Sequence, residues 1–189
     1  MEEPLWNACS DGNVEEVIKL LQNEQINTNW QEPELSRTPF YVACENGHIE
    51  IVKLLLNDKR VDFNKAQNQG ATPFKIACFQ DHIEIVKLLL NEKRIDVNQV
   101  ISGWTPFYSA CQNGHIEIVK LLLNDQRVDI NNSNRYGWTP FYIACQEGHI
   151  EIVKLLLNDE RIDVNKATND TATPFLIACY SGQVDIVKY

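Results

Sequence analysis

The sequence predicts an all-α protein built as a solenoid of stacked helix-turn-helix units. One ten-residue word, HIEIVKLLLN, occurs four times without a change, at steps of 34, 33 and 34 residues, beginning at His48, His82, His115 and His149. Five Thr-Pro pairs recur with the same period. A fixed period of about 20 to 50 residues is the signature of a repeat array, in which each unit buries its apolar face against its neighbours.

Alignment of the copies divides the single array of residues 1–189 into six repeats. Their approximate limits are 1–34, 35–68, 69–101, 102–135, 136–169 and 170–189, the last being incomplete. Repeat one carries Glu16 and Lys19 where later repeats have Ile and Leu, and a polar outer face is typical of an N-terminal capping repeat. Repeat six stops at Tyr189, where its leucines should begin. We therefore expect a fragment of a longer protein, the alternative being a naturally short end that frays.

The first helix of each repeat is expected to begin at its Thr-Pro pair. A threonine hydroxyl accepts a free backbone N–H at a helix start, and proline fits the first helical position because no N–H is needed there. A left-handed glycine is expected to end this helix about two turns later. Repeat three has Asp81 at that position, which predicts a mild weak point.

The second helix is predicted over Ile49–Leu56 and its equivalents. Six of these eight residues are apolar. A helix that is apolar nearly all round must be covered on several sides, which a stack of repeats provides. Glu50 and Lys53 are three residues apart and should meet on the outer surface.

These motifs together resemble the ankyrin repeat across the whole chain. The shared features are a turn, the Thr-Pro start of a short first helix, the Gly-His linker, the Leu-Leu end of the second helix and the Asp-x-Asn exit, whereas the family's second Ala is Cys throughout this chain. The resemblance implies two antiparallel helices per repeat with a projecting β-hairpin finger, and a concave face of fingers and first helices. The chain departs from the family where the usual histidine after Thr-Pro-Leu is replaced, by Tyr41, Lys75, Tyr108, Tyr142 or Leu176.

Composition argues against several functional classes. The formal net charge is −9, and the Lys and Arg residues form no basic stripe of the kind that neutralises phosphates, so no nucleic-acid partner is expected. No apolar run approaches about 18 residues, so no membrane insertion is expected. The acidic start is not a secretory signal. We expect an intracellular protein, in the cytoplasm or the nucleus.

Cysteine and histidine each occupy one repeat position, which favours packing over chemistry. The cysteines are Cys9, Cys44, Cys78, Cys111, Cys145 and Cys179. Helices stack about 8–10 Å apart, too far for a disulfide or a shared metal ion, so we expect small buried core residues. The four histidines form a similar ladder, and we expect each to close its own linker and start the second helix. No catalytic group, cofactor site or metal site is predicted.

A third ladder consists of arginines that stand two residues before an aspartate, namely Arg60, Arg94, Arg127 and Arg161. Their arrangement is compatible with a phosphate-binding track. Acidic residues outnumber them locally, however, so surface ion pairing is the stronger expectation.

Comparison of the repeats with one another separates a constant scaffold from variable positions. Variation gathers at the finger tips and at the two residues after each Ala-Cys pair, which line the concave face in the family that the chain resembles. Aromatic residues and arginine are enriched at binding hot spots. The candidate partner-binding residues are Trp104, Trp138, Tyr136, Arg135, Gln112, Asn113, Gln146, Glu147, Phe79 and Tyr180. The alternative for the two indoles is that they stack on each other or on Tyr108 and Tyr142 to stiffen the fingers.

The sequence therefore predicts a non-enzymatic protein-interaction module that binds a protein partner on its concave face. Two alternatives stay open. In the first alternative the array is a passive structural spacer. In the second it recruits substrate for an enzyme elsewhere in a larger protein.

Overall fold

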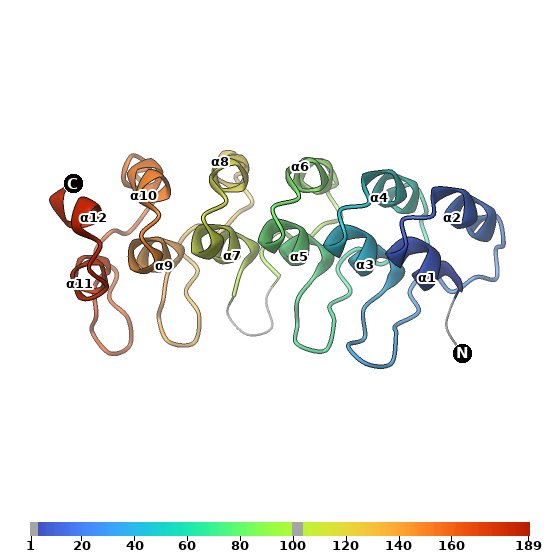
Figure 1. Ribbon diagram of the computed structural model, residues 1–189, viewed down its shortest axis with the longest axis horizontal. Coiled ribbons are helices and arrows are strands. Elements are labelled where there is room, and N and C mark those ends of the chain that lie inside the picture. The colour runs from blue at the N-terminus through green and yellow to red at the C-terminus, as the bar shows by residue number, and fades with distance from the viewer. Residues whose placement is uncertain (1–3, 100–103) are drawn as a thin grey trace. The chain divides into compact units, whose positions relative to one another are not determined.

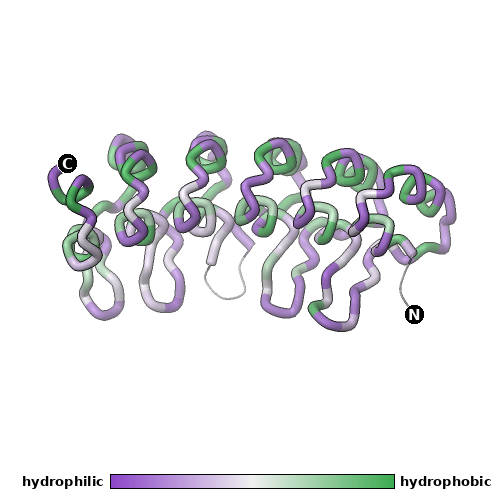
Figure 2. The backbone as a smooth tube through the Cα atoms, viewed as in Figure 1, coloured by the Kyte–Doolittle hydropathy of each residue, from purple (hydrophilic) through white to green (hydrophobic). Residues whose placement is uncertain are grey.

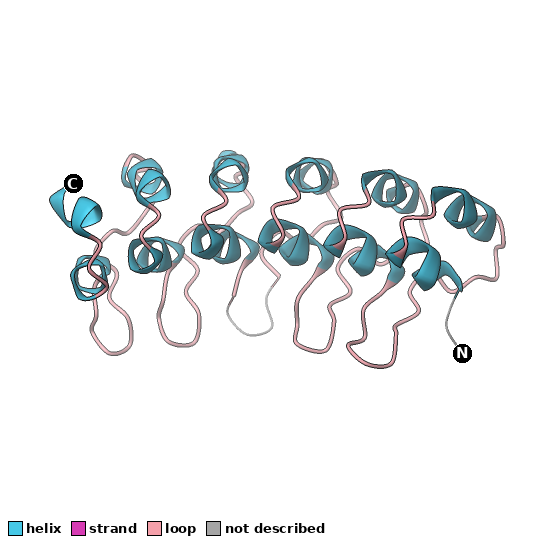
Figure 3. Ribbon diagram, in the orientation of Figure 1, coloured by secondary structure: helices cyan, strands magenta, loops and turns pink. Residues whose placement is uncertain are grey.

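The computed structural model describes residues 4–99 and 104–189. The chain forms two compact units, Met1–Ile101 and Ser102–Tyr189. Each unit contains three helix-turn-helix repeats, and Figure 1 shows loops between α2 and α3, α4 and α5, α8 and α9, and α10 and α11 that project below the paired helices. The described residues contain helices and loops but no strand (Figure 3). The predicted helical repeat fold is confirmed.

The helices follow the predicted pattern of a short first helix and a second helix of similar length. In the first unit they are α1 (Pro4–Ser10), α2 (Val14–Leu21), α3 (Pro39–Glu45), α4 (Ile49–Leu56), α5 (Pro73–Phe79) and α6 (Ile83–Asn91). In the second they are α7 (Pro106–Asn113), α8 (Ile116–Asn124), α9 (Pro140–Glu147), α10 (Ile150–Leu157), α11 (Pro174–Tyr180) and α12 (Val184–Lys188).

The Thr-Pro pairs start the first helices as expected. The hydroxyl of Thr38 accepts the backbone N–H of Tyr41 at 3.1 Å, and Pro39 occupies the first turn. The same cap is formed by Thr72, Thr105, Thr139 and Thr173. At the other end, Gly114 is left-handed with φ 77°, and Asp81 adopts the same region with φ 60°.

The second helices bury one face of the repeated word. In α4, Ile51, Val52 and Leu55 are fully buried, whereas Glu50 and Lys53 pair at the surface at 2.7 Å. The equivalent Glu–Lys pair forms in α6, α8 and α10. Figure 2 shows that the apolar segments concentrate in the helices, while the fingers are largely polar or neutral. The apolar residues of the repeated ten-residue sequence therefore build the core, and its glutamate and lysine face solvent.

The fingers are hairpin loops, which differs from the β-hairpins that we expected. In the finger of repeat five, Gly137 N–H donates to the Asn134 carbonyl at 2.9 Å, and Asn134 N–H donates to the Trp138 carbonyl at 3.1 Å. Bonds at the tip make a tight turn, but a strand needs a longer ladder. Neighbouring fingers touch through the Asn169 N–H, which donates to the Tyr136 carbonyl at 3.0 Å.

Thr171 occupies the turn position that Gly137 has in the preceding finger, and both are left-handed, with φ of 63° and 82°. A β-branched residue is strained there. We expect Thr171→Gly to raise the free energy of unfolding by about 0.5–1 kcal/mol. Gly137→Thr should instead destabilise, because its Cβ would lie 2.8 Å from the Asn169 nitrogen. Urea denaturation followed by circular dichroism measures the free energy of unfolding of both variants. If both substitutions changed it in the same direction, the two residues would not occupy equivalent left-handed turn positions.

The histidines do not close their own linkers, and that prediction was wrong. His48 and His82 form no side-chain cap on their own helices. Their Nε2 atoms instead hydrogen-bond to main-chain oxygens of the preceding repeat, with His48 at 3.0 Å from Ser10 O and His82 at 2.8 Å from Glu45 O. His149 reaches Gln112 O in the same way at 2.9 Å. Equivalent positions of neighbouring repeats lie side by side in the stack, so each of these imidazoles reaches the main chain of the preceding repeat. The histidines therefore connect two repeats and do not bond within their own.

The arginine ladder forms the expected surface ion pairs. Each pair joins the arginine to the acidic residue two positions earlier, at 2.6–2.7 Å, as in Arg60–Asp58, Arg94–Glu92, Arg127–Asp125 and Arg161–Asp159. The guanidinium of Arg60 also donates to the Leu21 carbonyl at 3.0 Å, at the end of α2. It thus satisfies a carbonyl that a helix C-terminus leaves free.

An asparagine ladder joins the exits of the second helices. The Asn29 amide donates to the Arg60 carbonyl at 2.7 Å, and its oxygen accepts the Asp62 N–H at 2.7 Å. Asn64 and Asn131 make the same pair of bonds to the repeats that follow them. The Asn of the Asp-x-Asn motif is therefore a connector between repeats.

Candidate functional site

The candidate residues lie on the fingers and at the ends of the first helices. In the second unit, Arg135, Tyr136 and Trp138 belong to the finger of repeat five, Gln112 and Asn113 end α7, Gln146 and Glu147 end α9, and Tyr180 ends α11. Trp104 directly precedes the Thr105 cap of α7. Phe79 ends α5 and belongs to the first unit.

Each candidate indole packs on the tyrosine that follows it in its own repeat. Trp104 meets Tyr108 edge to face, with ring centroids 4.8 Å apart and planes at 88°. Trp138 stacks on Tyr142, with centroids 5.8 Å apart and planes at 23°. The alternative named from the sequence, that the indoles stack on Tyr108 and Tyr142, is confirmed. Both indoles stay partly exposed, so the contacts hold them at the surface.

A second aromatic contact extends this cluster along the finger. Tyr136 lies 5.6 Å from Trp138 and is 43% exposed. The Arg135 guanidinium lies 4.8 Å above the Tyr136 ring and donates to its hydroxyl oxygen at 2.6 Å. Asn134 fixes the turn, because its side-chain oxygen accepts the N–H groups of Tyr136 and Trp138. The finger of repeat five is thus preorganised.

Two further aromatic candidates are open to solvent. Tyr180 is 88% exposed, and Phe79 is 44% exposed. Single exposed apolar residues are common on protein surfaces. Tyr180 matters here because it follows the Ala-Cys pair of repeat six in the same unit as the stacked indoles.

Negative charge lies beside the tyrosines that support the indoles. Burial and then the Asp170 carboxylate raise the pKa of Tyr142. Burial, followed by Glu147, likewise raises the pKa of Tyr108. The Tyr108 hydroxyl is buried, and no described residue gives it a hydrogen-bond partner. Each of these two tyrosines therefore has a carboxylate near enough to oppose the ionisation of its hydroxyl.

In the first unit an arginine of the chain itself lies against an aromatic ring and two carboxylates, a cluster that was not predicted from the sequence. The Arg37 guanidinium lies 5.5 Å from the Trp6 ring centroid and pairs with Glu32 and Glu45, each at 3.0 Å. Burial opposes the ionisation of Glu32, but hydrogen bonds from Leu35 and Arg37 hold its pKa below the usual value. The available signal was Arg37 itself, which stands where later repeats have Ala or Trp.

Five of the six cysteines are buried, as predicted, but Cys179 is exposed. Burial raises the pKa of Cys9 and of Cys145 to about 12. The expectation of a buried thiol is wrong for repeat six. Helix α11 packs against α9, but no described residue covers α11 in the same way on its other side, so Cys179 stays exposed.

Native protein is expected to react with a thiol reagent such as dithionitrobenzoate at one rapid equivalent, since the thiolate is the nucleophile and only Cys179 is accessible. Cys179→Ser should abolish the rapid phase, and Cys145→Ser should leave it unchanged. The absorbance of the released thiolate measures both. Rapid reaction of several thiols in the native protein would refute the buried ladder.

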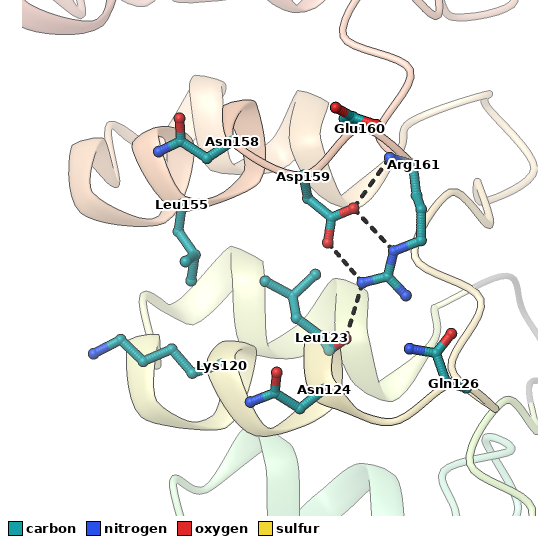
Figure 4. Close-up of a pocket in the computed structure, with 9 residues that line it drawn as sticks. All are labelled: Lys120, Leu123, Asn124, Gln126, Leu155, Asn158, Asp159, Glu160 and Arg161. Carbon is teal, nitrogen blue, oxygen red and sulfur yellow. Dashed lines mark hydrogen bonds and ion pairs between the residues drawn. The ribbon is translucent and has the colours of Figure 1, made fainter.

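One surface hollow of the second unit is not built like a ligand site. It is a surface pocket of about 570 Å³ beside α8 and α10, with Lys120, Asn124 and Asn158 on its walls (Figure 4). Its arginine, Arg161, is already occupied, because its guanidinium donates to Asp159 and to the Leu123 carbonyl. The alternative of a phosphate-binding track, which was the weaker expectation for the arginine ladder, therefore has no free arginine in this pocket.

Neither a metal-binding cluster nor a membrane-spanning helix is found in the part of the chain that the structure describes. Across residues 4–99 and 104–189, no three His, Cys, Asp or Glu side chains gather where they could hold a metal ion. Among the helices in the same ranges, none has both the length and the apolar character needed to cross a bilayer.

Comparisons with known proteins agree on the family. A model of ankyrin repeats, in three copies, matches residues 2–67, 60–134, 95–168 and 126–189. The crystal structure of the ankyrin repeat protein EF0377 is similar to this chain, with a TM-score of 0.89 and 29% sequence identity over 100% of this chain and 96% of the other. No curated protein matches the sequence. The chain therefore belongs to the ankyrin-repeat family, whose repeats in general serve as protein-interaction modules.

Proposed function

We propose that this protein is a non-enzymatic interaction module that binds a protein partner on its concave face, the face of fingers and first helices. The contact is centred on Trp104, Trp138, Tyr136, Gln112, Gln146 and Glu147. The observation that carries the proposal is the stacking of both variable-position indoles on tyrosines of their own repeats. The side chains that differ between repeats are thus the ones held partly exposed on a rigid support.

Rigid presentation favours binding. Ordering a side chain on association costs about 0.5–1.5 kcal/mol. The Trp138 ring is already fixed by Tyr142, and its finger is fixed by Asn134, so little of this cost arises on binding. Aromatic hot spots of this kind dominate the binding energy of many protein interfaces.

The test is partner capture with the double variant Trp104→Ala, Trp138→Ala. It should keep the helical circular dichroism of the parent and lose the proteins that the parent retains from a cell extract. Trp30→Ala, which removes an indole outside the candidate set, is the matched control and should retain them. Unchanged capture by the double variant would refute the proposal and favour a passive spacer.

A further inference from the structure

Two buried polar atoms of the second unit have no hydrogen-bond partner among the described residues, namely the hydroxyl oxygen of Tyr108 and Nδ2 of Asn134. Tyr108 is fully buried in α7, and Asn134, in the finger of repeat five, is only 5% exposed. Buried polar groups without a partner are rare in native proteins, so each of them needs an explanation. The equivalent pair in the first unit shows that one explanation serves both.

That equivalent pair is Tyr41 of α3 and Gln67, which lies in the finger of repeat three. Gln67 follows Tyr41 by 26 positions, as Asn134 follows Tyr108. Both tyrosines also donate their backbone N–H to the threonine cap of their own helix, at 3.1 and 2.9 Å. Burial and then Glu45 raise the pKa of Tyr41, whereas a hydrogen bond from the Gln67 side chain lowers it. In the first unit, then, the finger side chain bonds directly to the tyrosine of the preceding repeat.

The two fingers hold these side chains in the same way. Gln67 N–H donates to the Ala71 carbonyl at 3.0 Å, and Asn134 N–H donates to the Trp138 carbonyl at 3.1 Å. Both residues therefore occupy the same position in the turn, with the same main-chain bond across it.

Their side-chain oxygens also have the same role. The Gln67 oxygen accepts the N–H of Gln69, and the Asn134 oxygen accepts the N–H of Tyr136 at 2.9 Å and that of Trp138 at 3.1 Å. Because the oxygen of each amide is turned toward its own finger, the NH2 group is left to face the preceding repeat. The equivalence therefore places Asn134 Nδ2 opposite the Tyr108 hydroxyl, the other atom that lacks a partner.

The side chains differ in length, and this explains why only one pair bonds directly. Asparagine is one methylene shorter than glutamine, so its nitrogen stops about 1.5 Å short. A direct bond of about 2.9 Å would become a separation of about 4.4 Å, which is too long for a hydrogen bond. Two hydrogen bonds of about 2.8 Å that meet at one water oxygen span roughly 4.6 Å. The Asn134 N–H donor and the Tyr108 hydroxyl, which can donate or accept, give such a water the two polar partners that a buried water needs.

We propose that one water molecule is bound between the Tyr108 hydroxyl and the side-chain amide of Asn134, and that it joins α7 to the finger of repeat five. The water oxygen accepts an Asn134 N–H, and the water shares its second hydrogen bond with the Tyr108 hydroxyl. The same finger displays Tyr136 and Trp138, so the water is a structural part of the support for these two rings. The inference concerns the free protein and stands or falls separately from the proposed function.

The first test is a set of high-resolution crystal structures of the full chain and of two reciprocal variants. The parent should hold an ordered water about 2.7–3.2 Å from both Tyr108 Oη and Asn134 Nδ2. Asn134→Gln should replace this water by a direct bond to Tyr108. Gln67→Asn, the matched change in the first unit, should bring a water to Tyr41 that the parent does not have there.

The second test is made in solution and depends on the sign of a stability change. If the Tyr108 hydroxyl bonds to a buried water, Tyr108→Phe removes a hydrogen bond and should raise the equilibrium constant of unfolding about two- to tenfold. If the hydroxyl were dry and without a partner, phenylalanine would fit better and the constant would stay the same or fall. Tyr41→Phe removes a direct bond and is the control, which should raise the constant in either case. Urea denaturation followed by circular dichroism measures both variants.

Three outcomes would overturn the inference. The first is a parent crystal structure in which Tyr108 and Asn134 bond directly or have no water between them. The second is a water that keeps its place in Asn134→Gln, because it would then be held by other groups. The third is an unchanged or lower equilibrium constant of unfolding for Tyr108→Phe beside a raised one for Tyr41→Phe.

Discussion

Leu156→Ala is expected to lower the free energy of unfolding by about 3 kcal/mol. Leu156 is fully buried in α10, on the face that packs against α9 and the neighbouring second helices. Truncation of a buried leucine to alanine removes apolar contacts and leaves a cavity, at a cost of about 2–5 kcal/mol. The loss is a large share of the stability of an ordinary domain, about 5–15 kcal/mol.

The next residue of the same helix supplies the control. Leu157 has the same side chain but is 39% exposed, and it lines a surface hollow with Phe141 of α9 and Ile186 of α12. Leu157→Ala should cost about 1 kcal/mol or less, since a partly exposed side chain transfers less apolar area from water. Urea denaturation followed at 222 nm compares the two midpoints and slopes. Equal losses would mean that α10 is rotated or that its packing is looser than described.

The difference between these two leucines shows what the sequence could not predict. Leu156 and Leu157 both belong to the invariant ten-residue sequence, which predicted a second helix that is apolar nearly all round. Which of three successive leucines is buried depends on the rotation of the helix against its neighbours, and this is set by tertiary packing. The periods and caps, by contrast, are local signals, and Thr38 and its equivalents start their helices as the sequence indicated.

The histidine ladder failed for a related reason. A linker position suggested a local cap, yet His48 bonds to Ser10, which is 38 residues away. The contact is long in sequence but short in space, because the repeats place equivalent positions side by side. Repeat six carries Gln183 instead, and its amide donates to the Gln146 carbonyl at 2.9 Å. Glutamine is, like histidine, a side chain with an N–H donor at its end. Its presence at the histidine position of repeat six was the feature of the sequence that could have indicated a hydrogen bond between repeats.

The candidate site was predictable in part. Variation between repeats identified Trp104 and Trp138, and their supporting tyrosines were named as an alternative partner. The Arg37 site was not found, because it needs Trp6 and Glu45 from different repeats to meet at one point. The spacing of these residues along the sequence does not show that their side chains come together at Arg37.

Gly114→Ala is expected to destabilise the protein by about 2–4 kcal/mol, for two separable reasons. Gly114 ends α7 with φ 77°, where an added Cβ costs about 1–2 kcal/mol. That Cβ would also lie 2.7 Å from Cε1 of His149, whose imidazole is held by its bond to Gln112 O. The histidine of the next repeat packs over the glycine, so the substitution disturbs the linker and the contact between repeats together.

The chain contains a control with the same backbone and no imidazole above it. Gly182 has φ 71°, and a Cβ there would meet nothing within 4 Å. Gly182→Ala should therefore show only the backbone cost, about 1–2 kcal/mol. The difference between the two glycines, obtained from urea denaturation, measures the contribution of the His149 contact.

A double-mutant cycle tests the cause directly. His149→Ala removes the ring and should cost about 1–2 kcal/mol, because it also leaves the Gln112 carbonyl without its partner. In that background, Gly114→Ala should cost no more than Gly182→Ala does, since only the backbone strain remains. Strictly additive losses would show that the imidazole yields freely and that glycine is needed at this position for its φ alone. A strong interaction term would instead make the Gly-His pair a joint between repeats: glycine leaves the space, and the histidine of the following repeat fills it.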